Sequence, residues 1–259
     1  MTLAVITDLD GTLLDSTTYA WEPARPAIEA LRVRGVPLVV CTSKTWAESS
    51  RLQQMLGLPG PAVVENGGGV HDGDETVVLG IEYRVVLEAF TEMKSACPSL
   101  RGFSDMDDSE VAKRTGLPLE IAALARRREF DEPFVVGEDG EAPPASVLEI
   151  AAARGLLISR GGRFHHLHGG SDKGRGAREA RRRLEGRLGP LRVVALGDSP
   201  SDLSFLAEAD IAVILPRPDG TLDPSLVSAL PAALPAARHA RAPGPAGWNA
   251  AVLQVLAEA

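Results

Sequence analysis

Apolar and polar positions in the first part of the chain follow a repeating order of strand and helix. Residues 3–10 ("LAVITDLD") form a continuous apolar run, which is typical of a parallel strand covered on both faces. Residues 23–35 have helical spacing, with prolines near the start and a glycine as the stop signal. The strand "VPLVVCTS", the helix "TWAESSRLQQMLG" and the strand "PAVVENGGG" come next. This order predicts a parallel sheet with right-handed crossovers.

The pattern changes from about residue 81 to residue 168. Two neighbouring strands at 156–160 and 163–169 meet at the pair Gly161–Gly162, which suits a tight hairpin turn. Antiparallel pairing there implies a separate α+β unit. The other elements expected in this region are helices at 83–96, 117–128 and 145–155 and a short strand at 132–136.

The alternation of helices and strands resumes after this region. A helix at 174–188, a strand at 192–199, a helix at 201–209, a strand at 211–215 and a final helix at 248–259 are expected. We therefore predict an α/β fold: a Rossmann-like parallel-sheet core with an inserted α+β cap. The core takes residues 1–80 and 170–259 and the cap takes residues 81–169. Glycines at the expected linkers are compatible with opening of the cap.

Composition and charge narrow the class of protein. The 259 residues carry a net charge of −8, which argues against general nucleic-acid binding. No apolar stretch approaches the roughly 20 residues of a spanning helix, and the first residues lack a basic region typical of a secretory signal. Only two cysteines occur. We therefore expect a cytoplasmic protein with no membrane partner, and the basic stretch at 154–187 suits a small anionic ligand.

Reactive side chains follow four of the expected core strands. In open α/β sheets the carboxyl ends of the strands carry the ligand site, so these residues are expected to converge. Several carboxylates at one edge suit a hard divalent cation, and Mg²⁺ fits such an oxygen site. Hydroxyls and lysines beside it would neutralise a phosphoryl group. The residues are Asp8 and Asp10; Thr42, Ser43 and Lys44; Glu65 and Asn66; and Asp198 and Asp202.

The motifs "DLDGTLLD", "CTSK", Lys173 and "GDSPSD", in this order, resemble the four motifs of the haloacid dehalogenase superfamily of phosphotransferases. The resemblance implies that Asp8 is a nucleophile that forms an aspartyl-phosphate and that Asp10 is the acid and base. It further implies that Thr42 hydrogen-bonds the phosphoryl oxygens and that Lys173 offsets their charge. The implied Mg²⁺ ligands are Asp8, the main-chain carbonyl of Asp10, Asp198 and, as ligand or support, Asp202.

A narrower resemblance covers the cap and its borders. "TSKT", "ENGG", "RREFDEPF" and "GGRFHHLHGGSDKG" are similar to segments of mannosyl-3-phosphoglycerate phosphatases. The implied substrate is a phosphorylated sugar-glycerate, hydrolysed to mannosylglycerate, a compatible solute. Its carboxylate needs cations and its sugar needs hydrogen-bonding groups. The candidates are Arg128, Arg163 and His165 for the carboxylate and glycerate, and Ser43, Lys44, Glu65, Asn66 and Gly67 for the rim, with Glu65 or Asn66 accepting sugar hydroxyls.

Several alternatives stay open. A phosphatase for glucosyl-3-phosphoglycerate or another sugar phosphate, or a phosphohexomutase, would use the same motifs, and a non-catalytic sugar-phosphate sensor would keep the fold. Strand alternation predicts that His165 and His166 do not both face a ligand. The arginines near residue 128 and Lys44 also have purely structural interpretations as helix ends. The sequence makes no prediction about the oligomeric state.

Overall fold

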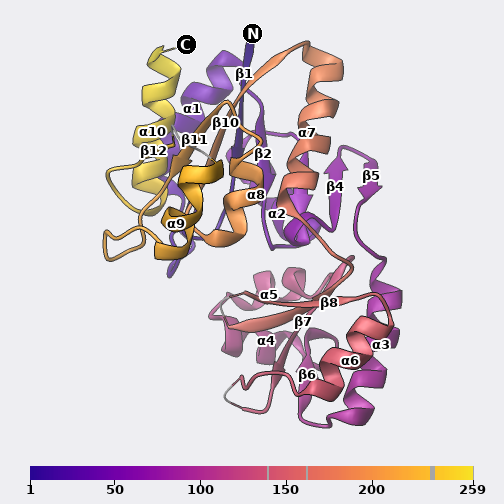
Figure 1. Cartoon of the computed structure of the whole chain (residues 1–259). Helices are drawn as coiled ribbons and strands as arrows, with labels where there is room; N and C mark the ends of the chain where they lie inside the picture. The colour runs from indigo at the N-terminus through magenta and orange to yellow at the C-terminus, as the bar shows by residue number, and fades with distance from the viewer. Residues whose placement is uncertain (139, 162, 234–236, 259) are drawn as a thin grey trace.

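The computed structural model describes residues 1–138, 140–161, 163–233 and 237–258, and this part of the chain contains two β-sheets. Figure 1 shows the larger sheet with its helices above and the smaller sheet below, and both chain ends lie on the side of the larger sheet that is remote from the smaller one. The predicted fold class, a parallel-sheet α/β core with an inserted α+β unit, is confirmed.

The larger sheet is parallel over most of its width. The pairs from β12 to β3 are parallel, and β4 and β5 extend the sheet as an antiparallel hairpin. β1 is central and buried on both faces, as the apolar run at residues 3–10 predicts. Across the sheet, the strands are β12 (Arg238–His239), β11 (Ile211–Ile214), β10 (Leu191–Gly197), β1 (Thr2–Thr7), β2 (Leu38–Cys41), β3 (Ala62–Val64), β4 (Gly69–Asp72) and β5 (Glu75–Val78).

Helices cover both faces of this sheet. Alternate residues of β1 supply the two hydrophobic clusters: Leu3 and Val5 pack on one face, and Ala4 and Ile6 on the other. The first cluster is completed by α1 (Arg25–Arg34), α2 (Trp46–Leu56) and α10 (Gly244–Glu258), and the second by α7 (Lys173–Leu188), α8 (Leu203–Leu206) and α9 (Pro224–Ala233). Short 3-10 turns lie at η1 (Glu22–Ala24), η2 (Glu65–Gly67) and η4 (Pro200–Asp202).

The smaller sheet is antiparallel, as the hairpin signal predicts, with its helices on both sides. Phe134 of its second strand packs into a cluster with the first and last helices of the unit, and Val135 packs into a separate cluster on the other face. The strands lie in the order β6 (Leu100–Gly102), β7 (Asp131–Val136), β9 (Phe164–His168) and β8 (Leu157–Gly161); the helices are α3 (Tyr83–Ala96), α4 (Asp108–Thr115), α5 (Leu119–Ala125) and α6 (Ala145–Ala153), with η3 at Phe103–Asp105.

Some elements differ from the sequence prediction. The hairpin of β4 and β5 was not expected, because each strand has only four residues and β5 is a largely exposed edge strand. The short β6 and α4 and the Pro/Ala-rich α9 were also not predicted, and the helix expected at 201–209 is reduced to η4 and α8. Predictions that involve Gly162, residues 234–236 or Ala259 fall outside the described residues.

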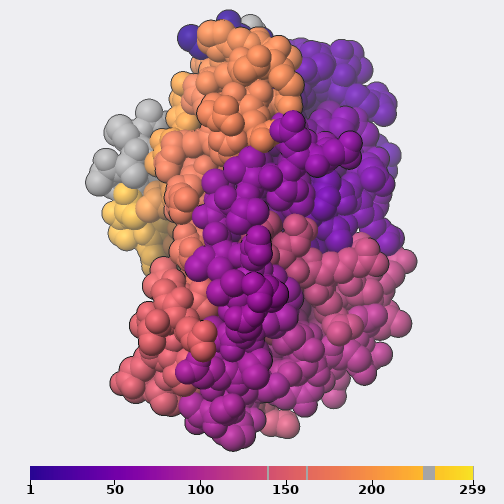
Figure 2. All heavy atoms as spheres, turned by 90° about the vertical axis from the view of Figure 1, so that its right-hand side faces the viewer, coloured from indigo at the N-terminus to yellow at the C-terminus, as the bar shows by residue number. Residues whose placement is uncertain are grey.

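The inserted segment meets the core at more than its two chain connections. Figure 2 shows the side where the chain runs from β4 and β5 down into α3, beside α7. Gly80 and Ser171, one from each connection, lie next to each other, since a Cβ on Gly80 would be 3.2 Å from Ser171 Oγ. Phe130, far from both connections in sequence, belongs to the hydrophobic cluster of the core. The segment is therefore attached to the core at a third place.

Candidate active site

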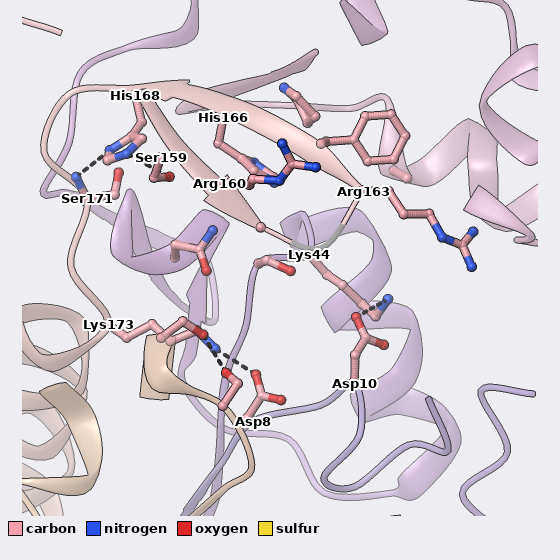
Figure 3. Close-up of a pocket in the computed structure, with 18 of the residues that line it drawn as sticks. Asp8, Asp10, Lys44, Ser159, Arg160, Arg163, His166, His168, Ser171 and Lys173 are labelled. Atoms are coloured by element: carbon pink, nitrogen blue, oxygen red, sulfur yellow. Dashed lines mark hydrogen bonds and ion pairs between the residues drawn. The ribbon is translucent and has the colours of Figure 1, made fainter. Parts of the chain in front are cut away.

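The carboxyl ends of β1 and β10 bring together two aspartates and a lysine. Lys173, the first residue of α7, places its Nζ 2.7 Å from Asp8 Oδ1 and 2.7 Å from Asp202 Oδ1. All three side chains are buried, with 9% or less of each exposed. Figure 3 shows this contact at the floor of a pocket. The convergence of strand ends predicted from the sequence is thus present for these residues.

Asp198 completes a cluster of carboxylates next to Lys173. One oxygen each of Asp8, Asp198 and Asp202 lies within 4.8 Å of the others, and Thr12 donates a hydrogen bond to Asp198 Oδ1. Burial and the nearby Asp202 raise the pKa of Asp198 to about 6 and also raise the pKa of Asp8, although Lys173 acts in the opposite direction. One lysine does not balance three carboxylates. The oxygen donors and their excess of negative charge fit Mg²⁺.

Gly11 allows this cluster to form. Its φ is +83°, and a Cβ there would lie 2.5 Å from Asp198 Oδ2. A larger residue would therefore clash with the carboxylate in a backbone conformation that L side chains rarely adopt.

The side chain of Asp10 takes a different partner from that of Asp8. Lys44 places Nζ 2.9 Å from Asp10 Oδ2 and 3.8 Å from Glu48 Oε1. Although burial acts in the opposite direction, Asp10 and Glu48 raise the pKa of Lys44, so its ammonium stays charged. Tyr19, which has a positive φ of 58°, covers the ammonium with its ring at 5.0 Å. The carboxylate cluster comprises Asp8, Asp198 and Asp202, and the expected main-chain contact of Asp10 to Mg²⁺ remains a prediction.

The segment after β2 is shaped by the start of α2. Thr45 and Glu48 form the capping box that their spacing predicts. This box fixes the turn that carries Thr42, Ser43 and Lys44. Thr42 is buried and its Oγ1 accepts the backbone N–H of Lys44, whereas Ser43 and Lys44 line the pocket.

The segment after β3 behaves differently from the sequence prediction. Glu65 and Asn66 both have positive φ, 49° and 58°, and this turn separates their side chains. Asn66 lines the pocket, but the Glu65 carboxylate is fully buried and accepts the backbone N–H groups of residues 129–131. Gly67 packs against the main chain of Asp172. The structure therefore does not bring Glu65 or Gly67 to the rim, and Glu65 has no free oxygen for a sugar hydroxyl.

A cavity of about 630 Å³ lies between the core edge and the smaller sheet. Arg163 lines it and also donates to the carbonyl oxygens of Arg114 and Thr115 at the end of α4. Arg128 is nearly buried in its wall, paired with Asp131 and in contact with the carbonyl oxygen of Ser43. Both arginines are thus at the predicted site, but Arg128 is already committed to protein partners.

His165 does not face the cavity. Its Nε2 donates to the carbonyl oxygen of Glu141, and its ring packs 5.5 Å from that of Phe134 in the cluster behind the sheet. Leu167, two residues on, is buried in the same cluster, so strand alternation places His165 with it. The expectation for His165 is therefore corrected: His166 and His168 line the cavity instead.

Sequence reasoning missed several cavity residues. Arg160 of β8 and His166 of β9 line the cavity, and Tyr19 lines it from the core (Figure 3 labels the first two). The apolar Leu167 was the available signal for the histidines. The arginines of α7 do not belong to this group: Arg178, Arg182 and Arg183 pair with nearby glutamates on the surface.

Among the described residues, no helix has both the length and the apolar character needed to cross a membrane.

Comparison with known proteins gives consistent matches. The family described as haloacid dehalogenase-like hydrolase matches residues 5–96. A glucosyl-3-phosphoglycerate/mannosyl-3-phosphoglycerate phosphatase of Methanococcoides burtonii is 35% identical over 97% of this chain and 96% of its own. A protein of the same description from Persephonella marina is 34% identical over 99% of this chain and 98% of its own.

Structural comparison adds a match to the fold. A solved sugar phosphatase of haloacid dehalogenase subclass IIB superposes with a TM-score of 0.66 at 17% identity, covering 98% of this chain and 99% of that chain. At this identity the match supports the architecture alone.

Proposed function

The chain belongs to the haloacid dehalogenase-like hydrolases, and on that premise we propose that it is a phosphatase of glycosyl-3-phosphoglycerates. Mannosyl-3-phosphoglycerate is the substrate expected from the sequence motifs, and glucosyl-3-phosphoglycerate is equally compatible, since both relatives carry both names. The observation that carries the proposal is the position of Asp8: a buried carboxylate held by Lys173 at the floor of a cavity that has arginines on its opposite wall.

The proposed first step is attack of an Asp8 carboxylate oxygen on phosphorus. The bond from phosphorus to the glycerate oxygen breaks, and Asp10 donates a proton to that oxygen as it leaves. Water then attacks phosphorus in the aspartyl-phosphate, and Asp10 takes a proton from that water. Phosphate is released and the Asp8 carboxylate is regenerated. Lys173 screens the repulsion between Asp8 and the phosphate in both steps. Thr42 is proposed to hydrogen-bond the phosphoryl oxygens.

We further propose that Asp8, Asp198, Asp202 and the main-chain carbonyl of Asp10 hold Mg²⁺. The ion, when bound, supplies positive charge that lowers the repulsion between carboxylate and phosphate.

The unit of residues 81–169 is proposed to act as the cap that recognises the rest of the substrate. Arg163 and Arg160 suit the glycerate carboxylate because they are cations at the cavity wall. On the core side, Ser43, Lys44 and Asn66 line the cavity and are the proposed rim contacts, with the Lys44 ammonium already paired to Asp10.

The test is phosphate release from mannosyl-3-phosphoglycerate, glucosyl-3-phosphoglycerate, 3-phosphoglycerate and mannose phosphates, each with Mg²⁺ and with a chelator. We expect a strong, Mg²⁺-dependent preference for the two glycosyl-phosphoglycerates. Turnover of hexose phosphates alone would reject the cap assignment. Transfer of phosphate between positions of the sugar, with none released, would indicate a mutase, and binding without turnover would indicate a sensor.

A further inference from the structure

Four ionisable side chains form a buried chain of contacts from the core to the cavity. Arg128 Nε lies 3.5 Å from Glu65 Oε2, and the guanidinium also pairs with Asp131 Oδ1. The other oxygen of Asp131 lies 2.9 Å from Nδ1 of His166, which lines the cavity. The side chains of Glu65, Arg128 and Asp131 are at most 3% exposed, whereas that of His166 is 13% exposed. His166 is therefore the most exposed member of the chain, although Arg128 also borders the cavity.

The charge state of Asp131 fixes which nitrogen of His166 carries hydrogen. Although burial acts in the opposite direction, Arg128 and His166 lower the pKa of Asp131 to about 2. An ionised carboxylate only accepts hydrogen bonds, so Nδ1–H of His166 is the donor in this contact. In the neutral ring this leaves Nε2 with a lone pair, as an acceptor.

Strand alternation separates this pair from two similar neighbours. Asp131 and His166 lie on the cavity face of β7 and β9. Pro133, which is opposite His166 in the sheet, also lines the cavity. Glu132 and His165 lie on the opposite face, where Glu132 accepts hydrogen bonds from Ser104 and Tyr83. Glu132 is therefore a matched control for Asp131, and His165 is a matched control for His166, because each neighbour faces the other side of the sheet.

Space for the His166 ring comes from Gly161 on the neighbouring strand. A Cβ at Gly161 would lie 3.1 Å from His166 Nε2, tighter than most real contacts. Gly161 itself lines the cavity and brings no side chain against Nε2, while Ser159 and Arg160 of the same strand line the cavity beside it.

We propose that Asp131 is a positioning residue that holds His166 with Nε2 as an acceptor for a sugar hydroxyl of the substrate in the cavity. The proposal rests on the proposed function, because it requires a glycosyl group. It makes His166 a determinant of sugar recognition, and it gives Arg128 and Glu65, expected from the sequence to touch the substrate, the role of fixing Asp131.

The kinetic test uses His166→Asn, which keeps a donor for Asp131 but has no atom at the position of Nε2. We expect KM for mannosyl- or glucosyl-3-phosphoglycerate to rise roughly three- to tenfold, the effect of one neutral hydrogen bond, with kcat nearly unchanged. KM for 3-phosphoglycerate, which has the phosphate and carboxylate but no sugar, should not change. An equal rise for both substrates would overturn the proposal, because it would place His166 at the carboxylate.

The spectroscopic test reads the His166 ring directly. In the substrate-free protein above pH 8, ¹⁵N chemical shifts of His166 should report the Nδ1–H tautomer in the wild type and the Nε2–H tautomer in Asp131→Asn. Glu132→Gln, the adjacent buried acid, should leave the tautomer and KM unchanged, as should His165→Gln for KM. An Nε2–H tautomer in the wild type would overturn the positioning role.

A double variant separates positioning from general support. Asp131→Asn combined with His166→Asn should raise KM no further than His166→Asn alone. Additive effects would mean that Asp131 acts independently of His166. If the wild type hydrolyses neither glycosyl-3-phosphoglycerate, the proposed function and the sugar contact both fail, whereas the tautomer measurement still decides the positioning role of Asp131.

Discussion

The ammonium group of Lys44 lies 2.9 Å from Oδ2 of Asp10, whereas Oδ1 of the same carboxyl group is buried with no hydrogen-bond partner among the described residues. Lys44 is thus the side chain that orients the proposed acid and base. We expect Lys44→Met to lower kcat about 10- to 100-fold, part of what general acid–base catalysis contributes. Lys44→Arg, which keeps the charge, should lose less. Phosphate-release kinetics check this, and an unchanged kcat in Lys44→Met would contradict it.

Asp8→Asn should abolish turnover while the fold is retained. The amide cannot attack phosphorus, so kcat should fall by at least about 10³-fold. Because the substitution also removes a negative charge from the carboxylate cluster, we expect no drop in the thermal midpoint of the metal-free protein. Beryllium fluoride, which mimics an aspartyl-phosphate, should inhibit the wild type. Substantial activity in Asp8→Asn would exclude the covalent mechanism.

Arg163→Ala should raise KM for the glycosyl-3-phosphoglycerates about tenfold, because a charge-assisted contact to the carboxylate is lost. For a mannose phosphate, which has no carboxylate, the change should be much smaller. Since Arg163 also donates to two carbonyl oxygens at the end of α4, a purely structural role predicts equal effects on both substrates. The ratio of the two KM changes distinguishes these cases.

Glu65→Ala should destabilise the protein by about 3–5 kcal/mol. The substitution removes the acceptor for three N–H groups, two of them buried and one partly buried, and leaves Arg128 with one acid fewer. Denaturant unfolding measures the effect. Glu120→Ala is the control, because Glu120 pairs with Arg51 at the surface and should cost under about 1 kcal/mol. Similar losses for the two variants would show that the Glu65 contacts contribute little.

His168 should make the protein sensitive to acid. Burial lowers the pKa of His168, and its Nδ1 accepts the N–H of Ser171 in the connection back to the core. Because the pKa of His168 is lower in the folded than in the unfolded protein, neutral His168 stabilises the fold. This stabilisation is complete above about pH 6.5 and is lost as the pH falls further. The thermal midpoint of the wild type should therefore fall relative to that of His168→Gln between about pH 7.5 and pH 5. A difference in thermal midpoint between the two proteins that stays constant across this pH range would contradict the role assigned to His168.

The core of the site was predictable because its residues are placed by local patterns. An apolar strand followed by Asp8, and a second followed by Asp198, must deliver both to the same sheet edge, and the position of Lys173 at the start of a helix completes the contact. To predict which of His165 and His166 faces the cavity, one more fact was needed: which side of β9 packs Leu167 against α3 and α6. Leu167 could be read from the sequence, but the pairing of β9 with its neighbouring strands could not.

Glu65 shows a limit of a different kind. As a residue type after a core strand it is indistinguishable from a ligand-binding acid. Its role is decided by the positive φ of Glu65 and Asn66 and by the arrival of residues 129–131, more than sixty positions away, beneath its carboxylate. Pairings at that separation depend on tertiary structure, and local spacing carries no signal for them.

The insertion of Phe130 into the core cluster, with Glu65 binding the backbone around it, has a consequence for how substrate enters. A lid joined only through the adjacent connections at Gly80 and Ser171 could rotate about them freely. Here the same rotation would disturb an aromatic ring in an apolar site and three hydrogen bonds, two of them buried and one partly buried. Phe130 packs against Gly68, which also neighbours Gly80, so this third contact lies beside the two connections and stiffens the hinge itself. We therefore expect the inserted segment to swing away from the cavity more slowly than a segment held by its two connections alone.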